Sequence, residues 1–351
     1  MEYLQNAGYS CTIAPFATPI LFRALQNRRQ LATKVSQTLY CTLRRLLRVR
    51  ALKRFDLIVI HREAFPFLSP LVERWILSMH ARVVFSFDDA IYNGHDEVSS
   101  LNHPLLYRAK YGHGYDEVMR RCVHVIAGNR VLAEHAKRLN PNVSIIPTVV
   151  DCRQFKYKSP RRYNHGPLTI GWMGSRSTVR YLSIIEPALR KVAEVHGDRV
   201  QFLFVGAPEH KLNVPRARYL SFNLERELHD LHSLDIGLMP MPDTEWTRGK
   251  CAFKAIQYMA AGIPTVASPV GIATDVIQHN VTGLLANSTD EWVNGLGRLI
   301  SDHSLRERLS RSARRTIEQS YSLHVWGPRL VLLLDQLSNS VRVVSDGSVA
   351  A

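Results

Sequence analysis

The chain has 351 residues, of which 46% are hydrophobic and 21% charged, and its formal net charge is +15. This length is enough for two domains, and the composition is that of a globular protein rather than a disordered one. No apolar run is long enough to span a membrane, and no charged start followed by an apolar stretch indicates a secretory signal. The five cysteines are scattered and lack metal-ligand spacing, which favours reduced thiols in a cytoplasmic protein.

The N-terminal residues MEYLQNAGYSCTIAPF are expected to form a helix, a turn at Gly8 and then a strand. A doubly wound domain normally opens with a strand and a glycine-rich turn before its first helix. The sequence therefore predicts an N-terminal domain that lacks its first strand. Either an edge strand is missing, or the start of the natural protein is not represented.

The positive charge is concentrated between residues 22 and 55, where ten arginines and lysines occur without an acidic residue. Leucines at positions 39, 43, 46 and 47 have helical spacing, with arginines between them. Two interpretations are open: an amphipathic helix on an anionic membrane surface, on the inner face of the membrane, or a solvated helix packed on its own domain. Nucleic acid is not expected as a partner, because no recognisable binding motif accompanies the charge.

Short β-branched runs alternate with helical stretches in both halves of the chain, which favours α/β layers with parallel strands. Strands are expected at 55–60, 81–87, 123–129 and 143–150, and then at 168–174, 200–206, 235–241, 265–270 and, more weakly, 283–286. The polar segment 151–167 is expected to be an interdomain linker. We predict two Rossmann-like doubly wound domains, 1–158 and 159–318, that face each other across a cleft and are followed by a C-terminal helix and tail, 319–351.

Polar side chains follow two strands of the first half. His61, Arg62 and Glu63 end one strand, and Asp88 and Asp89 end the next. Carboxylates at strand ends suit hydrogen bonding to a hydroxyl-rich substrate or a metal, and the alternative is a helix cap with an ion pair to Arg62. A metal is less favoured, because no cluster with ligand spacing accompanies the pair.

A turn at residues 170–182 of the second half is a candidate anion site. A strand ends at Gly174, Ser175 is a natural helix cap, and Arg176 and Arg180 supply positive charge. The turn lacks the G-x-x-x-x-G-K-[ST] pattern of a Walker loop. The alternative is an ordinary capped turn between a strand and a helix.

The segment RGKCAFKAIQYMAAG, residues 248–262, predicts a mostly apolar and therefore buried helix. At about 100° per residue, Lys250, Lys254 and Gln257 fall on one narrow arc. A buried lysine needs a counter-charge, because an unpaired buried cation is strongly destabilising.

No carboxylate occurs between residues 246 and 274, so the counter-charge is a distant carboxylate or a ligand phosphate. Arg248 and Gly249 precede the helix, where free backbone N–H groups and the helix dipole attract an anion. We therefore favour the phosphate.

Together these segments resemble those of the family 4 glycosyltransferases of the GT-B fold. The resemblance runs from about residue 55 to 330 and is densest at 235–271, where a strand, a proline-containing loop, a helix with QYMAAGIP and the strand TVASPVG follow one another. The motifs IGWMGS, FDDAIY, VIAGN and IIPTVVD also occur in the family's order.

The resemblance implies a retaining, hexosyltransferase-like enzyme that works without a metal or another cofactor. Its C-terminal domain would bind a nucleotide diphosphate sugar, and its N-terminal domain a hydroxyl acceptor such as a glycan, a lipid-linked sugar or a small molecule. The last helix of such chains crosses back to the N-terminal domain.

The resemblance gives three residues a catalytic role. Arg180 takes the place of a phosphate-binding lysine, Lys254 matches a lysine in a variant of the helix, and Asp88 lies where many members carry a histidine. The donor-binding candidates are Gly174, Ser175, Arg176, Arg248, Gly249, Lys250 and Gln257. The acceptor-side candidates are His61, Arg62, Glu63 and Asp89.

The chain departs from the family pattern at the helix, where relatives carry two glutamates eight positions apart. Those positions are Gly249 and Gln257 here, and Ser175 replaces a typical arginine. Gln257 can hydrogen-bond sugar or ribose hydroxyls but cannot act as a carboxylate. Two other functions therefore stay open: a catalytically silent sugar-nucleotide-binding or scaffold protein, and a basic nucleic-acid-binding protein.

Overall fold

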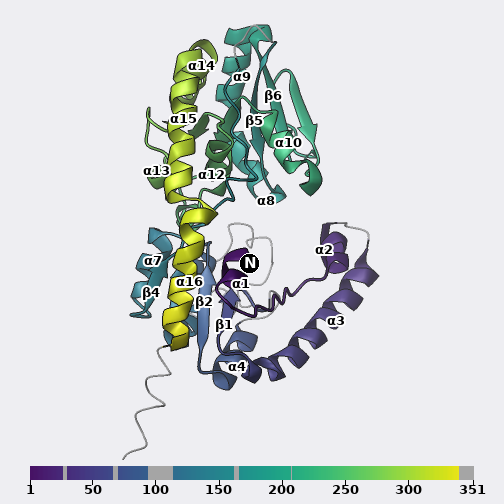
Figure 1. Ribbon diagram of the computed structural model, residues 1–351. Coiled ribbons are helices and arrows are strands. Elements are labelled where there is room, and N and C mark those ends of the chain that lie inside the picture. The colour runs from purple at the N-terminus through teal and green to yellow at the C-terminus, as the bar shows by residue number, and fades with distance from the viewer. Residues whose placement is uncertain (27–29, 66–69, 94–113, 162–165, 207, 340–351) are drawn as a thin grey trace, which may run out of the picture. The chain divides into compact units, whose positions relative to one another are not determined.

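The structure, a computed structural model, describes residues 1–26, 30–65, 70–93, 114–161, 166–206 and 208–339 (Figure 1). Parts of the basic segment 22–55 therefore lie outside the described residues. The chain forms two compact units: unit 1 comprises Met1–Ile146 and Gly327–Ala351, and unit 2 comprises Pro147–Trp326. Each unit contains a parallel sheet, so the predicted α/β fold class with two Rossmann-like units is confirmed.

Unit 1 is built on a parallel sheet whose described strands follow one another in chain order. They are β1 (Ile58–His61), β2 (Val83–Phe87), β3 (His124–Ala127) and β4 (Val143–Ile145). Ile60 lies opposite Phe85, which lies opposite Val125. The interior strands β2 and β3 are almost entirely buried, as expected of strands covered on both faces. The connecting helices are α4 (Leu71–Met79), η2 (Ile91–Asn93), α6 (Gly114–Arg121) and α7 (Arg130–Lys137).

The N-terminal segment differs from its prediction. Helix α1 (Glu2–Asn6) and the turn at Gly8, with φ at 83°, are present, but residues 9–18 form no strand. The backbone carbonyls of residues 14–16 accept hydrogen bonds from Arg44 and Arg45, at 2.8–3.1 Å. Guanidinium groups thus satisfy carbonyls that a neighbouring strand would otherwise bind. Those arginines belong to α3 (Leu31–Arg50), which packs beside α2 (Pro19–Gln26) and is followed by η1 (Leu52–Arg54).

Unit 2 contains the reversal of strand order that defines a doubly wound sheet. Its strands are β5 (Leu168–Met173), β6 (Val200–Val205), β7 (Ala217–Leu220), β8 (Ile236–Met239), β9 (Thr265–Ala267) and β10 (Leu284–Leu285). In the described residues their order is β10-β9-β8-β5-β6-β7, so the reversal lies between β5 and β8. The sequence missed β7, because the edge strand ARYL is only half-buried and lacks an apolar run.

Helices cover both faces of this sheet, and the core of unit 2 lies between them. They are α8 (Arg176–Val179), η5 (Arg180–Ile184), α9 (Glu186–His196), η6 (Gly197–Arg199), η7 (Leu224–Arg226), α10 (Glu227–His232), α11 (Glu245–Arg248), α12 (Phe253–Ala260), α13 (Ala273–Val276), α14 (Thr289–Ser301) and α15 (His303–Ser320). The fully buried aromatic side chains of Trp172, Phe202 and Trp292 belong to one hydrophobic cluster with the helices α9 and α14.

The last helix, α16 (Leu323–Asn339), enters unit 1 at Gly327. A Cβ atom at Gly327 would lie 2.6 Å from the ring of Tyr3, so α16 packs closely against α1. The Tyr9 hydroxyl donates a hydrogen bond to Asp335. Within the described residues, no helix combines the length and the apolar character that crossing a membrane requires.

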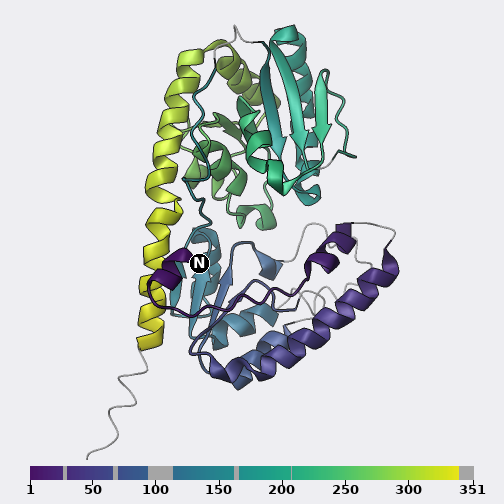
Figure 2. The ribbon, with the colours of Figure 1, turned by 45° about the vertical axis from the view of Figure 1, so that its right-hand side comes forward.

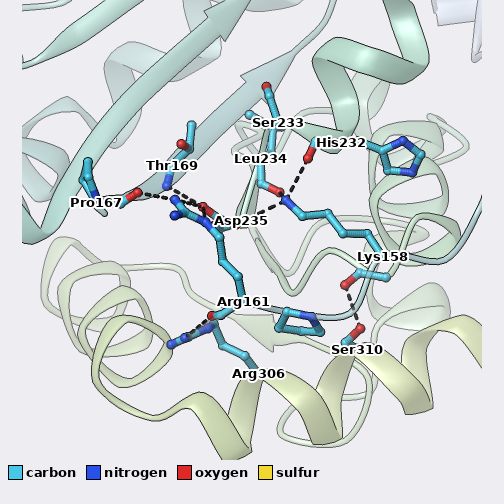
Figure 3. Close-up of polar contacts among 12 residues, drawn as sticks. Lys158, Arg161, Pro167, Thr169, His232, Ser233, Leu234, Asp235, Arg306 and Ser310 are labelled. Carbon is cyan, nitrogen blue, oxygen red and sulfur yellow. Dashed lines mark hydrogen bonds and ion pairs between the residues drawn. The ribbon is translucent and has the colours of Figure 1, made fainter. Parts of the chain in front are cut away.

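The predicted linker belongs to unit 2, and this moves the division of the chain from residue 158 to residue 146. Lys158 donates to the carbonyls of His232 and Leu234 and contacts Asp235 at 3.2 Å, and Arg161 forms a bidentate ion pair with Asp235. Figure 3 shows both side chains reaching Asp235, whose side chain is 3% exposed. The polar composition of this segment suggested a linker. The anion that binds Lys158 and Arg161 lies about 75 residues further along the chain, so the local sequence does not reveal it.

We expect the substitution Asp235→Asn to destabilise unit 2. Burial would raise the pKa of Asp235, but the hydrogen bonds from Arg161 and the charge of Lys158 outweigh it and hold the pKa below the ordinary 3.8. Removing the shared anion of a buried ion pair lowers the free energy of unfolding by about 3 kcal/mol, which urea unfolding at neutral pH measures.

A depressed carboxyl pKa contributes stability above the unfolded-state value that is lost as the pH falls through the folded-state value. The difference between Asp235→Asn and the parent should therefore shrink below pH 3.8. The fully exposed Asp198, 3.5 Å from Arg216, provides the control Asp198→Asn, for which we expect little change. Equal effects of the two substitutions would contradict the assigned role of Asp235.

Candidate functional site

The candidate site of unit 2 begins at the C-terminal ends of β5 and β6, where two glycine turns meet. Gly206 has φ at 120°, and a Cβ atom there would lie 1.7 Å from the carbonyl oxygen of Gly174. The Gly174 N–H donates to Val205, and the Gly206 N–H donates to Leu220. The two backbones therefore touch at the edge of the sheet where doubly wound folds bind ligands.

The side chain of Lys254 crosses the β5 turn. A Cβ atom at Gly174 would lie 2.5 Å from Cε of Lys254 and 2.4 Å from the ring of Trp172, and Nζ of Lys254 is 5.5 Å from the centre of that ring. The structure thus brings together Gly174 and Lys254, two candidates that are 80 positions apart in the sequence. The lack of a side chain at Gly174 is what allows this approach.

Tyr258 fixes the helix that carries Lys254. Its hydroxyl accepts a hydrogen bond of 3.0 Å from the N–H of Met173, the last residue of β5. A Cβ atom at Gly237 would lie 2.6 Å from the Tyr258 ring, so the ring lies directly on β8. Burial raises the pKa of Tyr258. Lys254, one turn earlier on α12, is therefore held at the end of β5.

Helix α12 begins at Phe253, so the predicted arc with Lys250 is wrong. Ala252 precedes the helix in the left-handed conformation, with φ at 52°, and this breaks the helical path between Lys250 and Lys254. Nζ of Lys250 instead lies 4.8 Å from the centre of the Trp246 ring. The arc prediction holds for Lys254 and Gln257, which are both on α12.

Arg248 is the last residue of the short helix α11, and Gly249 caps its C-terminal end. Arg248 donates to Asp243 at 2.6 and 3.0 Å, and this exposed ion pair raises the pKa of Arg248 and lowers that of Asp243. The partner of Arg248 is therefore an acid five positions earlier. A Cβ atom at Gly271, where φ is 55°, would lie 2.3 Å from the Arg248 carbonyl, which packs the loop after β9 onto this turn.

The turn after Gly174 contains three further candidates, Ser175, Arg176 and Arg180. Ser175 is the N-cap of α8, and its hydroxyl contacts that of Ser177 at 2.7 Å. Arg176 forms an exposed ion pair with Glu209 at 2.7 Å. Arg180 is exposed at the start of η5, and its guanidinium lies 5.5 Å from the centre of the Tyr181 ring. Because α8 is a single turn, these side chains contribute more positive charge here than the helix dipole does.

Gln257 has a carboxylate partner that the sequence did not reveal. Its side chain is buried, and its amide donates a hydrogen bond of 2.9 Å to the half-buried Glu227 at the start of α10. Helix α10 follows β7, so Glu227 lies on the same edge of the sheet as Lys254. Because the sequence did not predict β7, it could not place Glu227 at this edge of the sheet.

In unit 1, three of the acceptor-side candidates and the catalytic candidate Asp88 form one cluster at the ends of β1 and β2. Arg62 contacts Asp89 at 3.0 Å and Asp88 at 3.8 Å, and His61 lies 3.9 Å from Asp88 and 3.3 Å from the Ser86 hydroxyl. Arg62 has φ at 59°, and its N–H donates to the Ser86 carbonyl. The ion pair with Arg62, which was the alternative for the two aspartates, is present.

Glu63 lies beside a buried acid that positions this loop. Glu73, on α4, is fully buried, and its Oε1 accepts the N–H groups of Ala64 and Phe65 at 2.7 and 3.3 Å. Burial raises the pKa of Glu73, and the charge of Glu63 adds to the rise. No sequence signal distinguishes Glu73 from an ordinary acid in the first turn of a helix.

Among the described residues, no group of three or more His, Cys, Asp and Glu side chains could hold a metal ion. The cluster around Asp88 and Asp89 consists of His61, Arg62 and the two carboxylates. Such a cluster can hydrogen-bond a hydroxyl group through both its donors and its acceptors.

We expect Tyr258→Phe to lower the free energy of unfolding by about 1–3 kcal/mol, because the buried N–H of Met173 loses its acceptor. Urea unfolding measures this change, and faster amide exchange at Met173 would locate it. Tyr40 is 54% exposed, so Tyr40→Phe is the control and should have no measurable effect. A Tyr258→Phe protein with parental stability and exchange would show that this hydrogen bond does not fix α12.

Comparisons with known proteins agree with this architecture. Residues 168–302 match the family model described as "Glycosyl transferases group 1". A segment of 70 residues is 34% identical to an uncharacterized glycosyltransferase of Methanocaldococcus jannaschii, and it spans 19% of this chain and 18% of that relative.

Solved structures resemble the chain over most of its length. Sucrose-phosphate synthase from Thermosynechococcus elongatus has a TM-score of 0.62 at 14% identity, covering 89% of this chain and 80% of that one. Anabaena HepE in complex with UDP-glucose has a TM-score of 0.62 at 15% identity, covering 83% and 82%. A glycosyltransferase from Rickettsia africae has a TM-score of 0.62 at 14% identity, covering 96% and 92%. The chain therefore has the two-unit fold of the GT-B glycosyltransferases, and its residues 168–302 match the glycosyl transferases group 1 family.

Proposed function

We propose that this chain is a glycosyltransferase that moves a sugar from a nucleotide diphosphate sugar to a hydroxyl group, with retention and without a metal. The acceptor would be a glycan, a lipid-linked sugar or a small polar molecule. The observation that carries the proposal is the position of Lys254, a cation held against the glycine turn of β5 in the segment that matches the family. The scattered spacing of the five cysteines supports a cytoplasmic location.

The donor diphosphate would bind at the Gly174 turn. The lack of side chains at Gly174 and Gly206 lets Lys254 and the two backbones lie close together there, and a phosphate oxygen would bind the Lys254 ammonium beside the turn. Negative charge develops on the departing diphosphate as its bond to the sugar breaks. A cation fixed at that place stabilises the transition state more than the ground state, which is the requirement for catalysis. Lys254 would supply this charge, and the exposed Arg180 would support it.

The pair formed by Gln257 and Glu227 would bind hydroxyl groups of the ribose or the sugar. Their contact of 2.9 Å uses one donor of the amide and one carboxylate oxygen, which leaves hydrogen-bonding capacity on both groups. This pair bears on the silent-protein alternative, because a carboxylate is present at this edge of the sheet even though Gln257 replaces a glutamate of the relatives.

The acceptor would bind at the cluster in unit 1. Asp88 would accept a hydrogen bond from the attacking hydroxyl, with His61 and Arg62 beside its carboxylate, and Asp89, which pairs with Arg62, would accept a hydrogen bond from the sugar. One carboxylate oxygen of Asp88 is buried and has no hydrogen-bond partner within 3.5 Å. Because the Asp88 side chain is nevertheless 29% exposed, an acceptor hydroxyl would bind its other carboxylate oxygen.

We expect Lys254→Ala to weaken donor binding by about 10–100-fold, because a charge-assisted hydrogen bond to phosphate is lost. A thermal-shift screen across nucleotide diphosphate sugars, beginning with the UDP-glucose that HepE binds, identifies the donor, and calorimetry then measures the loss. The control is Lys191→Ala, which removes an exposed lysine paired with Asp290.

Three outcomes separate the alternatives. Donor hydrolysis or transfer that disappears in Lys254→Ala supports the enzyme, whereas tight donor binding without any turnover supports the silent binding protein. Failure to bind any nucleotide diphosphate sugar would refute both. The anomeric configuration of the product, determined by nuclear magnetic resonance, tests retention separately.

Glu227→Gln should weaken the binding of the complete donor by about tenfold, because a hydrogen bond to a charged group becomes a neutral one. Binding of pyrophosphate alone should stay unchanged, since it has no hydroxyl groups to lose. Glu225→Gln is the matched control, as Glu225 is an exposed acid two positions earlier on η7. Equal loss for the donor and for pyrophosphate would show that Glu227 acts on the general electrostatics rather than on hydroxyl groups.

A further inference from the structure

The paired helices α2 and α3 of unit 1 have an exposed apolar face that their own packing does not require. Figures 1 and 2 both show α2 beside the N-terminal half of α3. Leu21 and Ala24 of α2 and Cys41 of α3 are completely or almost completely buried, and Thr18 donates to Gln37 between the helices. The inner faces of the pair are therefore already packed.

The outer face carries a regular row of large apolar side chains. Leu31, Val35, Leu39, Leu43 and Leu47 recur every four residues along α3 and are 54–71% exposed. Phe22 of α2 is 60% exposed. An extended apolar face of this kind on a protein surface marks an interaction site, because scattered single residues would not align along one helix. The interpretation that this row packs on its own domain is therefore not supported.

The charged residues of the segment that carries this row are all positive. Residues 22–55 contain no aspartate or glutamate. Arg44 and Arg45 bind backbone carbonyls, but Arg48, Arg50 and Lys53 are exposed. From Leu31, the exposed leucines of α3 fall within about 160° of the helix circumference, and Arg50 lies inside that arc at about 100°. Basic side chains among apolar ones can extend to phosphate groups while the leucines are buried.

We propose that the outer face of α2 and α3 binds the surface of an anionic lipid bilayer. A bilayer satisfies both features at once: its acyl region takes the leucines and Phe22, and its anionic headgroups take the exposed arginines and lysine. A second copy of the chain would bring two positive faces together, which is unfavourable. Nucleic acid would pair with the arginines but would leave the apolar row in water.

Flotation of the full chain with vesicles tests the proposal. We expect the protein to float with phosphatidylcholine–phosphatidylglycerol vesicles and not with phosphatidylcholine alone. Binding should fall when salt rises from about 0.1 M to about 1 M, which shortens the Debye length from about 10 Å to about 3 Å. Absence of flotation with anionic vesicles, or equal flotation with both kinds, would overturn the proposal.

Two sets of variants assign the binding to this face. Neutralising Arg48, Arg50 and Lys53 to glutamine should weaken partitioning by about 100-fold, since each basic residue contributes about one kcal/mol near an anionic surface. Neutralising the exposed Arg190, Arg308 and Arg315 of unit 2 removes the same charge and should have little effect. Equal losses in the two triple variants would show that net charge alone drives binding.

The apolar row is tested with the double variant Leu39→Gln and Leu43→Gln. It should reduce partitioning into vesicles by at least about tenfold. Val195 and Leu332 are 68% and 61% exposed, so Val195→Gln with Leu332→Gln is the control. Circular dichroism confirms folding of each variant, and sedimentation reports self-association. A dimer that dissociates in the Leu39 and Leu43 variant without any vesicle binding would overturn the proposal in favour of a second copy of the chain.

Discussion

The close approach of Lys254 to Gly174 is the contact on which the candidate site of unit 2 depends. It requires a glycine at the end of β5, because a Cβ atom there would lie 2.5 Å from the lysine side chain. It also requires α12 in one register, which Tyr258 sets through its hydrogen bond to Met173. Gly237 allows the Tyr258 ring to lie on β8. Three uncharged residues, Gly174, Gly237 and Tyr258, thus determine where the charge of Lys254 lies.

Gly174 and Lys254 were separate candidates in the sequence, and they meet because parallel strands share an edge. Strand β5 and the helix before β9 both open at the carboxyl end of the sheet, so Gly174 and Lys254 could be expected together before any distance was known. The strands themselves were visible as buried β-branched runs. Periodicity could not detect the left-handed residue Ala252, since an alanine gives no signal of positive φ, and this is why Lys250 was wrongly placed on the helix.

Long-range polar partners were the other part that the sequence could not provide. Glu227 and Gln257 are 30 positions apart, and Asp235 lies 74 positions beyond Arg161. Each pair depends on the order of strands in the sheet, which composition does not determine. The polar segment 151–167 was interpreted as a linker for the same reason: the anion that binds Lys158 and Arg161 is Asp235, which is distant in the sequence.

The same principle decides how the net charge of +15 should be interpreted. Some cations bind backbone carbonyls: Arg306, which is 1% exposed, donates to Leu299 and Arg161, and Arg314 donates to Cys152 and Ala260 in addition to its ion pair with Glu318. These arginines fix loops and helix ends through their bonds to backbone carbonyls. The net charge of the chain therefore includes arginines that stabilise the fold as well as cations that attract a ligand. Where a cation is held against the glycine turn of β5, as Lys254 is, or is exposed beside an apolar row, as Arg50 is, positive charge indicates a partner.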